Sequence, residues 1–376
     1  MVRSIDISNG KHTFLTAPIL SLHVITMASE PSQPSNKETM RAWQYTDASA
    51  GLERSLQLVE TTKPFPQLLS KSELLIQVLS MSLNPNDYKI PELGLASKLI
   101  VSTPAAPGLD FCGKVVATHT ANDRFTMGQM VFGRLDKLPR NGTLAEFVVA
   151  NQNEVVALRA GVGVDDAAAV GTAALTAYQS IVPFVKGLEN PAIFINGGSG
   201  GVGTWAIQIA NVLGAEVSVS CSGSSEELVR DLGAEHVLDY TKVDVIEGLK
   251  SVGPVYDLFV DNVGTPTNLY KESEHFLKPN GRYVQVAAQP SLSSGAQMMD
   301  KMLRPTWMGG GKRAYSFVSV KTKQDDLVQL ARWQAEGKIK AVIDEVFEYE
   351  DAPKAVEKLK TGHVKGKIVI HVSRGS

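Results

Sequence analysis

Three glycines have the spacing with the clearest chemical meaning. Gly198, Gly200 and Gly203 form the pattern G-x-G-x-x-G between the apolar run 192–195 and the periodic apolar run 204–213. This order predicts a strand, a tight turn and a helix whose N-terminus favours a diphosphate. We therefore predict a dinucleotide site, with a glycine-rich turn that binds no ligand as the alternative. The residues predicted to line it are Gly198, Ser199, Gly200, Gly201, Val202 and Gly203.

The end of the next apolar run indicates which dinucleotide fits. The run 216–221 leads into Ser222-Gly223-Ser224-Ser225, and no carboxylate follows before Glu226. NAD enzymes place an acid here on the ribose 2′-hydroxyl, whereas hydroxyls and backbone donors suit the 2′-phosphate of NADP. We therefore expect NADPH as the cofactor, with Arg230 as a further contact. The alternative is that the serines only cap the helix starting near Glu226.

Cysteine and histidine residues are too few and too scattered to predict a metal site. Cys112 and Cys221 provide neither a disulfide framework nor a four-cysteine zinc loop, which fits a reducing compartment. The seven histidines show no spacing typical of metal ligands. We therefore expect no bound metal.

The composition is that of an ordinary globular protein. The chain has 376 residues, of which 43% are hydrophobic and 20% charged, enough for about two domains. The formal net charge of −2 gives no global attraction to nucleic acid or to an anionic membrane. The nearly uncharged stretches 167–185 and 192–215 contain polar residues and glycines, which favour buried globular elements over membrane spans.

A β-rich part precedes the glycine turn. From Met40 to about Asn153, short alternating runs are broken by glycine and proline, a pattern typical of a barrel-like domain. The predicted strands are 41–45, 74–81, 113–117 and 145–150. The run 164–182 then has helical periodicity and predicts one or two helices.

An alternation of strands and helices follows and predicts a doubly wound sheet. Its predicted strands are 192–195, 216–221, 235–238, 257–261, 282–287 and 315–320, with the clearest helix between them at 225–232. The helix 325–336 and the strands near 341–347 and 367–372 are expected to return to the first domain.

Residues 1–39 have the character of a polar extension, and we predict that they are disordered. A moderately apolar run at 14–27 raises the alternative of a targeting segment, but Asp6 and a single arginine fit an organelle presequence poorly. Met27 is an alternative initiator. We expect a cytoplasmic protein, with a mitochondrial location as the alternative.

Several motifs, in the same order, resemble the medium-chain dehydrogenase/reductase superfamily in its zinc-free, quinone-oxidoreductase-like branch. They are the glycine turn and residues 84–89, 107–113, 142–147, 175–178, 261–264 and 362–369. Within the branch the chain is similar to reticulon-interacting oxidoreductases and to fungal dehydrogenases of secondary metabolism. The resemblance implies an α/β fold, with a GroES-like catalytic domain at 40–159 and 322–376 and a Rossmann cofactor-binding domain at 160–321.

The resemblance also implies roles for individual residues. Metal-dependent members of the superfamily hold zinc with a cysteine and a His-Glu pair, where this chain has Asn84 and Leu109-Asp110. Asn84, Asp87 and Lys89 are implied to lie beside the nicotinamide as catalytic residues. The other implied cofactor contacts are Thr176, Ser222, Ser225, Tyr240, Asn262, Val263, Gly366 and Lys367. Relatives often carry a lysine where Ser225 stands, and a plain strand-edge lysine is the alternative for Lys367.

Hydride transfer without a metal requires an acceptor that is already polarised, such as a quinone or an enone. The ammonium of Lys89 is suited to stabilise the enolate that forms or to deliver a proton. The alternatives for Lys89 are a phosphate or ribose contact and a salt bridge to Asp87. Related enoyl-thioester reductases have a tyrosine near the place of Leu95, which argues against a mitochondrial fatty-acid enoyl reductase.

The sequence therefore predicts an NADPH-dependent, zinc-independent oxidoreductase, a monomer or homodimer, that reduces a small-molecule quinone or α,β-unsaturated carbonyl. The resemblance implies secondary-metabolite biosynthesis as a setting. Two alternatives stay open, a non-catalytic NADPH-binding scaffold and an enoyl reductase acting on a carrier-bound polyketide. The loops 91–107 and 288–311, expected to line the substrate pocket, carry no recognisable chemistry.

Overall fold

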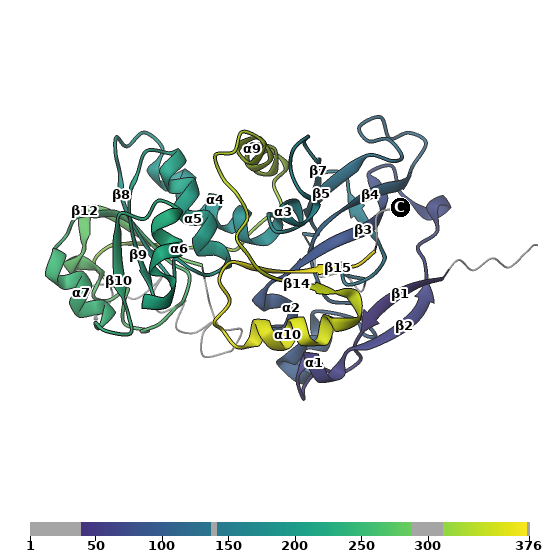
Figure 1. The fold of residues 1–376 in the computed structure, drawn as a ribbon, viewed down its shortest axis with the longest axis horizontal. Helices are drawn as coiled ribbons and strands as arrows, with labels where there is room; N and C mark the ends of the chain where they lie inside the picture. The colour runs from purple at the N-terminus through teal and green to yellow at the C-terminus, as the bar shows by residue number, and fades with distance from the viewer. Residues whose placement is uncertain (1–38, 137–140, 287–310, 374–376) are drawn as a thin grey trace, which may run out of the picture. The chain divides into compact units, whose positions relative to one another are not determined.

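Two large β-sheets organise the computed structural model, which describes residues 39–136, 141–286 and 311–373 (Figure 1). The strands of a six-stranded sheet lie between residues 192 and 317, and those of a seven-stranded sheet within 73–157 and 343–371. This arrangement confirms the predicted α/β fold. The domain limits at 159/160 and 321/322 stay a prediction.

The six-stranded sheet is parallel throughout, and its order is β10-β9-β8-β11-β12-β13. Its strands are β8 (Ala192–Asn196), β9 (Glu216–Cys221), β10 (His236–Asp239), β11 (Tyr256–Asp261), β12 (Leu277–Gln285) and β13 (Ala314–Phe317). All six match predicted strands, although β12 begins earlier and β13 ends earlier than expected. The strand order reverses between β8 and β11, where open α/β sheets bind ligands at the carboxyl ends of the strands.

Helices cover both faces of this sheet, which is why the central strand β8 is almost continuously apolar. Ile193 and Ile195 of β8 belong to the core formed with α4 (Gly171–Val185) and α5 (Gly201–Val212). Phe194, between them, points to the opposite face and stacks on Phe259 at 5.1 Å. That second face also buries side chains of α7 (Val245–Val252). The run 164–182 forms two helices, α3 (Val164–Ala168) and α4.

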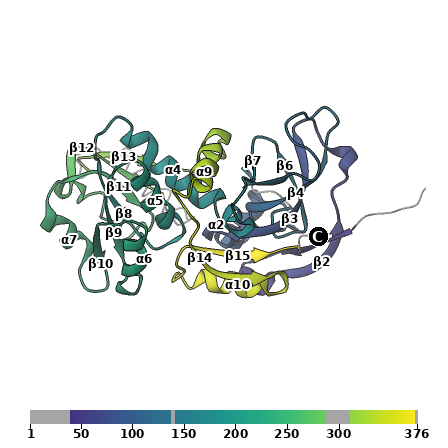
Figure 2. The ribbon, with the colours of Figure 1, turned by 45° about the horizontal axis from the view of Figure 1, so that its top comes forward.

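The long strand β3 (Glu73–Leu83) is the centre of the seven-stranded sheet, because it pairs with β4, β6 and β15. The other strands are β4 (Asp110–Thr118), β5 (Met130–Arg134), β6 (Phe147–Asn151), β7 (Val155–Ala157), β14 (Ile343–Glu348) and β15 (Lys367–His371). The antiparallel pairing of β15 with β3 places the C-terminal strands in the same sheet as β3. Figure 2 shows α10 (Ala352–Lys360) running along β14 and β15.

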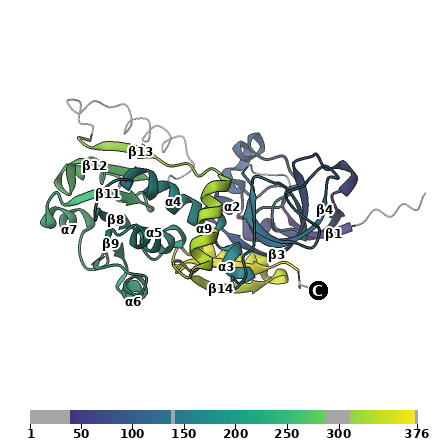
Figure 3. The same ribbon diagram turned by 90° about the horizontal axis from the view of Figure 1, so that it is seen from above.

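Smaller elements complete the fold. β1 (Thr39–Gln44) and β2 (Gln57–Thr62) form a two-stranded sheet. α9 (Gln324–Ala335) packs against α4 and β7, and Figure 3 shows it beside α4. The remaining helices are α1 (Leu52–Ser55), α2 (Pro85–Lys89), α6 (Glu226–Asp231) and the short 3-10 helices at Pro66–Leu68, Pro91–Leu99, Gly223–Ser225, Ser273–His275 and Tyr349–Asp351. Residues 1–38 of the predicted extension and most of the loop 288–311 lie outside the described residues. The predicted limit at residue 39 is wrong, because Thr39 begins β1 and pairs with Thr62. Within those residues, every helix is too short or too polar to cross a bilayer.

Candidate cofactor and active site

The glycine turn connects β8 to α5 at the point where the strand order reverses. A Cβ at Gly203 would overlap the carbonyl oxygens of Gly197 and Gly198, so only glycine lets α5 pack this closely on the turn. A Cβ at Gly200 would instead stand in open space, with the Gly197 oxygen 3.9 Å away as its only neighbour. The turn thus leaves room for a group against its backbone, which fits a diphosphate.

A second turn, after β11, faces the glycine turn across the reversal. A Cβ at Gly197 would lie 2.6 Å from Cγ2 of Val263, so the two turns adjoin. Both polar side-chain atoms of Asn262 are buried and have no hydrogen-bond partner among the residues that the structure describes. Leaving such groups unpaired is unfavourable, so this amide fits a site that a ligand completes.

Asp261, at the end of β11, holds this second turn in place. Its Oδ1 accepts hydrogen bonds from the backbone N–H groups of Val263 at 3.1 Å and Gly264 at 2.8 Å, and from Asn196 Nδ2 at 2.9 Å. Its Oδ2 accepts from the Tyr283 hydroxyl at 2.6 Å. Asp261 is fully buried and therefore acts as the anchor of the turn. Sequence reasoning missed this role. It noted Asp261 only as the first residue of the motif 261–264, and that position alone does not indicate an anchor.

The serine loop after β9 bonds within itself. The hydroxyl of Ser222 lies 3.0 Å from that of Ser224 and 3.4 Å from that of Ser225. Ser225 stands at the N-cap of α6 but its side chain makes no capping hydrogen bond, so the cap alternative is wrong. Tyr240, half exposed, follows the adjacent strand and bonds to the Cys221 carbonyl through its backbone N–H at 3.2 Å.

Lys365 brings a cation to the serine loop from a distant part of the chain. Its Nζ donates to the carbonyl oxygen of Ser224 at 2.7 Å, across 141 residues of sequence. Sequence reasoning missed Lys365, although it lies inside the C-terminal motif beside Gly366. The guanidinium of Arg230, in contrast, donates to the Glu226 carboxylate at 2.9 Å and to the Glu235 carbonyl at 3.0 Å. These contacts engage Arg230 with groups other than the hydroxyls of the serine loop.

An acid also lies beside this loop, which the sequence did not indicate. Asp239 ends β10, and its Oδ2 would be 2.6 Å from a Cβ at Gly223. Hydrogen bonds from Thr241 lower the pKa of Asp239 to about 2, so it is ionised. Lys242 Nζ lies 3.2 Å from the same oxygen. The acid is therefore paired with Lys242, and Lys365, which has no ion pair with another described residue, adds a positive charge to the loop.

The C-terminal motif lies against the glycine turn. The backbone N–H of Gly366 donates to the Ser199 carbonyl at 2.9 Å, and Gly366 forms an isolated bridge with Gly200. Cδ of Lys367 would lie 3.2 Å from a Cβ at Gly201. Lys367 is only 3% exposed, so the strand-edge alternative for this residue is wrong. The structure brings Gly366 and Lys367 to the predicted site.

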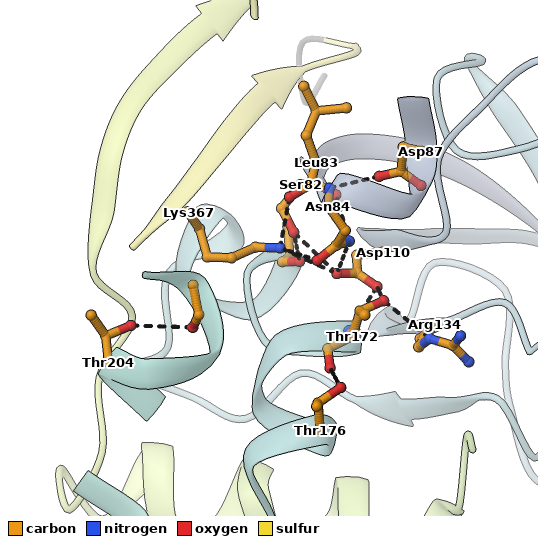
Figure 4. Close-up of polar contacts among 12 residues, drawn as sticks. Ser82, Leu83, Asn84, Asp87, Asp110, Arg134, Thr172, Thr176, Thr204 and Lys367 are labelled. Carbon is orange, nitrogen blue, oxygen red and sulfur yellow. Dashed lines mark hydrogen bonds and ion pairs between the residues drawn. The ribbon is translucent and has the colours of Figure 1, made fainter. Parts of the chain in front are cut away.

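The ammonium of Lys367 ends in a buried polar centre between β3, β4 and α4 (Figure 4). It donates to Asn84 Oδ1 at 2.5 Å and to the Leu83 carbonyl at 2.8 Å, and it lies 3.6 Å from Asp110 Oδ2. Asn84 Nδ2 donates to the same Asp110 oxygen at 2.8 Å. Burial lowers the pKa of Lys367, and the Asp110 charge opposes that shift.

Asp110 joins this centre to the N-terminus of α4. Its Oδ1 accepts from the Thr172 backbone N–H at 2.8 Å and from the Thr172 hydroxyl at 2.6 Å, where the helix dipole favours a carboxylate. Only glycine fits at 171, because a Cβ there would overlap the Asp110 carboxylate. Arg134 Nε donates to the Thr172 hydroxyl at 3.0 Å. Thr176, one turn further on, is buried and donates to the Thr172 carbonyl at 2.6 Å.

The short helix α2 carries the other predicted catalytic residues. Asp87 Oδ2 accepts from the Asn84 backbone N–H at 2.7 Å, whereas its Oδ1 is buried and has no partner among the described residues. Burial and the charge of Asp110 raise the pKa of Asp87 to about 7. In Figure 4 the carboxyl group of Asp87 lies on the opposite side of Asn84 from Lys367. This geometry gives Asp87 a role in holding α2.

Lys89 ends α2 and is half-buried. Burial lowers its pKa. Within the described ranges, its ammonium makes no hydrogen bond or ion pair, so the salt bridge to Asp87 is wrong. Contact with the nicotinamide or with an acceptor stays a prediction for Lys89.

The positions that correspond to zinc ligands are engaged otherwise. Leu109 is a buried apolar residue, and the Asp110 oxygens accept from Asn84, Ser82 and Thr172. Across the parts of the chain that the structure describes, no group of three or more His, Cys, Asp or Glu side chains could hold a metal ion. The zinc-free site itself stays a prediction.

Two protein-family models match the chain. The model described as alcohol dehydrogenase GroES-like domain matches residues 70–160, and the model described as zinc-binding dehydrogenase matches residues 232–370. The chain is 44% identical over 347 residues to the trans-enoyl reductase pgmF of Aspergillus terreus, covering 89% of this chain and 96% of that protein. It is 32% identical over 332 residues to the human mitochondrial NAD(P)H oxidoreductase RTN4IP1, covering 80% and 82%.

The structure is similar to that of the quinone oxidoreductase from Coxiella burnetii, with a TM-score of 0.77 and 29% identity. The match covers 89% of this chain and all of that chain. The similarity therefore extends over most of the fold.

Proposed function

We propose that this chain, which belongs to the medium-chain dehydrogenase/reductase superfamily, uses NADPH to reduce an activated double bond or a quinone without zinc. The superfamily is nicotinamide-dependent, and the chain is an oxidoreductase of it. One observation carries the proposal: the side chains at the positions of zinc ligands are already bonded to protein groups. Asp110 accepts from Asn84 and Thr172, and Asn84 accepts from the Lys367 ammonium. Without a metal to polarise a carbonyl, the acceptor must be electrophilic already.

The names of the relatives support this acceptor class. They include a trans-enoyl reductase, NAD(P)H oxidoreductases and quinone oxidoreductases. An enone and a quinone share the property that hydride addition leaves an oxyanion, which an ammonium stabilises. The fungal trans-enoyl reductase also supports a biosynthetic setting, in which a carrier-bound thioester is the alternative to a free enone.

When bound, NADPH supplies the hydride, and the protein supplies alignment and charge. The turn at 198–203 would hold the diphosphate, while Asn262 would close the site from the second turn. Thr176 and Asn84 would border the nicotinamide. The half-buried ammonium of Lys89, which makes no ion pair with a described residue, would offset the negative charge that develops on the reduced acceptor.

The preference for NADPH over NADH is supported by the serine loop and the charges around it. The hydroxyl groups of Ser222, Ser224 and Ser225 lie together and do not cap α6. Lys365 reaches the same loop. Asp239 would repel a 2′-phosphate, but Lys242 pairs with it, so the balance of charge favours NADPH.

A substrate panel tests the proposal. Oxidation of NADPH and NADH is followed at 340 nm with quinones, free enones and enoyl thioesters, before and after treatment of the protein with a chelator. We expect turnover with at least one acceptor, faster at low NADPH than at equal NADH. Binding of NADPH without turnover of any acceptor would instead favour the scaffold alternative, and preference for the thioesters would favour the carrier-bound substrate.

Location and assembly are part of the same proposal. We propose a cytoplasmic protein, with a mitochondrial location as the alternative because RTN4IP1 relatives are named mitochondrial. We propose a monomer or a homodimer. A fluorescent fusion at the C-terminus tests the first point, and light scattering of the purified protein tests the second.

A further inference from the structure

Lys367 differs from the other lysines that the structure describes, because it is the only one that is buried. Its methylene groups lie against the glycine turn that follows β8 of the six-stranded sheet. Its ammonium ends in the polar centre beside β3 of the seven-stranded sheet. A single side chain thus spans the distance from the predicted diphosphate turn to Asn84. Burying a charge costs hydration free energy unless hydrogen bonds and opposite charges in the protein replace the lost water. The groups that bind the ammonium therefore indicate its role.

The ammonium makes two hydrogen bonds and one ion pair with oxygen atoms of the protein. The partners are the Leu83 carbonyl at 2.8 Å, Asn84 Oδ1 at 2.5 Å and Asp110 Oδ2 at 3.6 Å. An ammonium has three donors and no acceptor. Two donors are therefore used by protein oxygens, and the ammonium as a whole is buried beside the Asp110 carboxylate. These contacts favour a role in which Lys367 acts through the groups that it holds.

The group held most closely is the amide of Asn84. Lys367 donates to Oδ1, and Asp110 accepts from Nδ2 at 2.8 Å. Because one partner can only donate and the other, as a carboxylate, can only accept, the amide has a single orientation. Its own backbone N–H bonds to Asp87, which fixes the start of α2, and α2 ends at Lys89.

We infer that Lys367 is a positioning residue, which fixes Asn84 and α2 against the cofactor turn and so aligns the reacting groups for hydride transfer. The inference rests on the proposed function and deepens it. It differs from the expected direct contact of Lys367 with the cofactor, because it assigns the ammonium to the protein's own amide. Removal of the ammonium should therefore lower the rate of hydride transfer and leave NADPH affinity nearly unchanged.

A double-mutant cycle tests the inference. Lys367→Met keeps the length of the side chain and removes the charge, and Asn84→Ala removes the amide that it holds. Single-turnover hydride transfer at saturating NADPH should fall on the order of 10²-fold in Lys367→Met, the effect of a misplacement of about 1 Å. In the Asn84→Ala background, Lys367→Met should have no further effect. Additive losses would overturn the inference, because independent sites add.

The NADPH dissociation constant separates the two roles of Lys367. It should stay within about twofold of the wild-type value in Lys367→Met, the usual margin for a residue that does not touch the ligand. A large increase in the dissociation constant at unchanged rate would mean direct contact with the cofactor and would refute the positioning role. Lys354→Met is the matched control, because Lys354 is an exposed lysine of α10 paired with Asp351; it should alter neither quantity.

Two further measurements keep the test valid if Lys367→Met does not fold. In the full chain without NADPH, a ¹H–¹⁵N correlation of lysine ammonium groups should show a protected signal that moves in Asn84→Ala. Absence of such a signal in the folded wild type would overturn the inference. Asp110→Asn should turn the Asn84 amide and lower the hydride-transfer rate at unchanged NADPH affinity. Wild-type protein that reduces no acceptor refutes the proposed function, whereas the ammonium signal reports on the geometry alone.

Discussion

Lys365→Met changes the charge beside the serine loop without altering the backbone. The ammonium donates to the Ser224 carbonyl at 2.7 Å, so its charge lies where the 2′-phosphate is expected. The nearby Asp239 and Lys242 form their own ion pair at 3.2 Å and contribute little net charge. Methionine has a similar length and lacks the charge, so the substitution isolates the electrostatic contribution of Lys365.

The size of the effect follows from Coulomb's law. Unit charges about 4 Å apart attract by roughly 1 kcal/mol in water and roughly 4 kcal/mol at an effective dielectric constant of about 20. Lys365 lies at the surface, where ion pairs have energies near the lower of these limits. We therefore expect its attraction to the 2′-phosphate to contribute about 1–2 kcal/mol to NADPH binding. The dissociation constant for NADPH should therefore rise roughly 5- to 30-fold. NADH lacks the 2′-phosphate and should bind Lys365→Met about as well as wild type.

Titration of cofactor fluorescence measures both dissociation constants directly. The difference between wild type and Lys365→Met should shrink as salt is raised, because the screening length falls to about 3 Å at 1 M. Lys338→Met, which removes an exposed charge paired with Glu336 at 2.9 Å, is the control and should leave both constants unchanged. An equal loss of affinity for NADPH and NADH would refute the reasoning, since it would place Lys365 away from the 2′-phosphate.

Four further predictions follow from the site and the sheets. Ser222→Asp should shift the preference toward NADH, measured as the ratio of the two dissociation constants, through repulsion of the 2′-phosphate and a new ribose contact. Lys89→Met should lower single-turnover hydride transfer on the order of 10²–10³-fold, the effect of losing one electrostatic donor; weaker NADPH binding at a normal rate would make it a cofactor contact instead. Activity should survive exhaustive chelation, and stoichiometric zinc lost together with activity would contradict the zinc-free site. The hydrogen bond with Asp165 raises the pKa of His371. The contribution of protonated His371 to the free energy of unfolding is therefore present below pH about 6.5 and is lost as the pH rises through the raised pKa. In urea unfolding, His371→Gln and wild type should differ in stability at low pH and converge at high pH.

The sequence by itself determined the elements that have a strong local pattern. The glycine spacing and the apolar runs around it located β8 and α5, because a turn, a strand and a helix each impose their own residue period. The same reasoning found the parallel sheet. It missed β2, β5 and β7, which are short or have little apolar alternation, so their local signal is weak and pairing with neighbouring strands decides them.

Part of the predicted site was also set by local sequence. The serine loop needed no tertiary information, because it follows the strand β9 directly. The charges around it did need such information. Asp239 lies there because β10 pairs with β9 in a register that places it opposite Cys221, and Lys365 arrives from the C-terminal motif.

The tertiary structure alone decided the role of Lys367. Ile368 of β15 stands opposite Leu83 of β3, so antiparallel pairing places Lys367 beside Asn84, 283 residues away in the chain. A shift of one residue in this register would turn the lysine to the other face of the sheet. Local sequence carries no information about such a register. It depends on the packing of the strands against the core, and that packing buries the charge of Lys367, whose strand lies between β14 and β3.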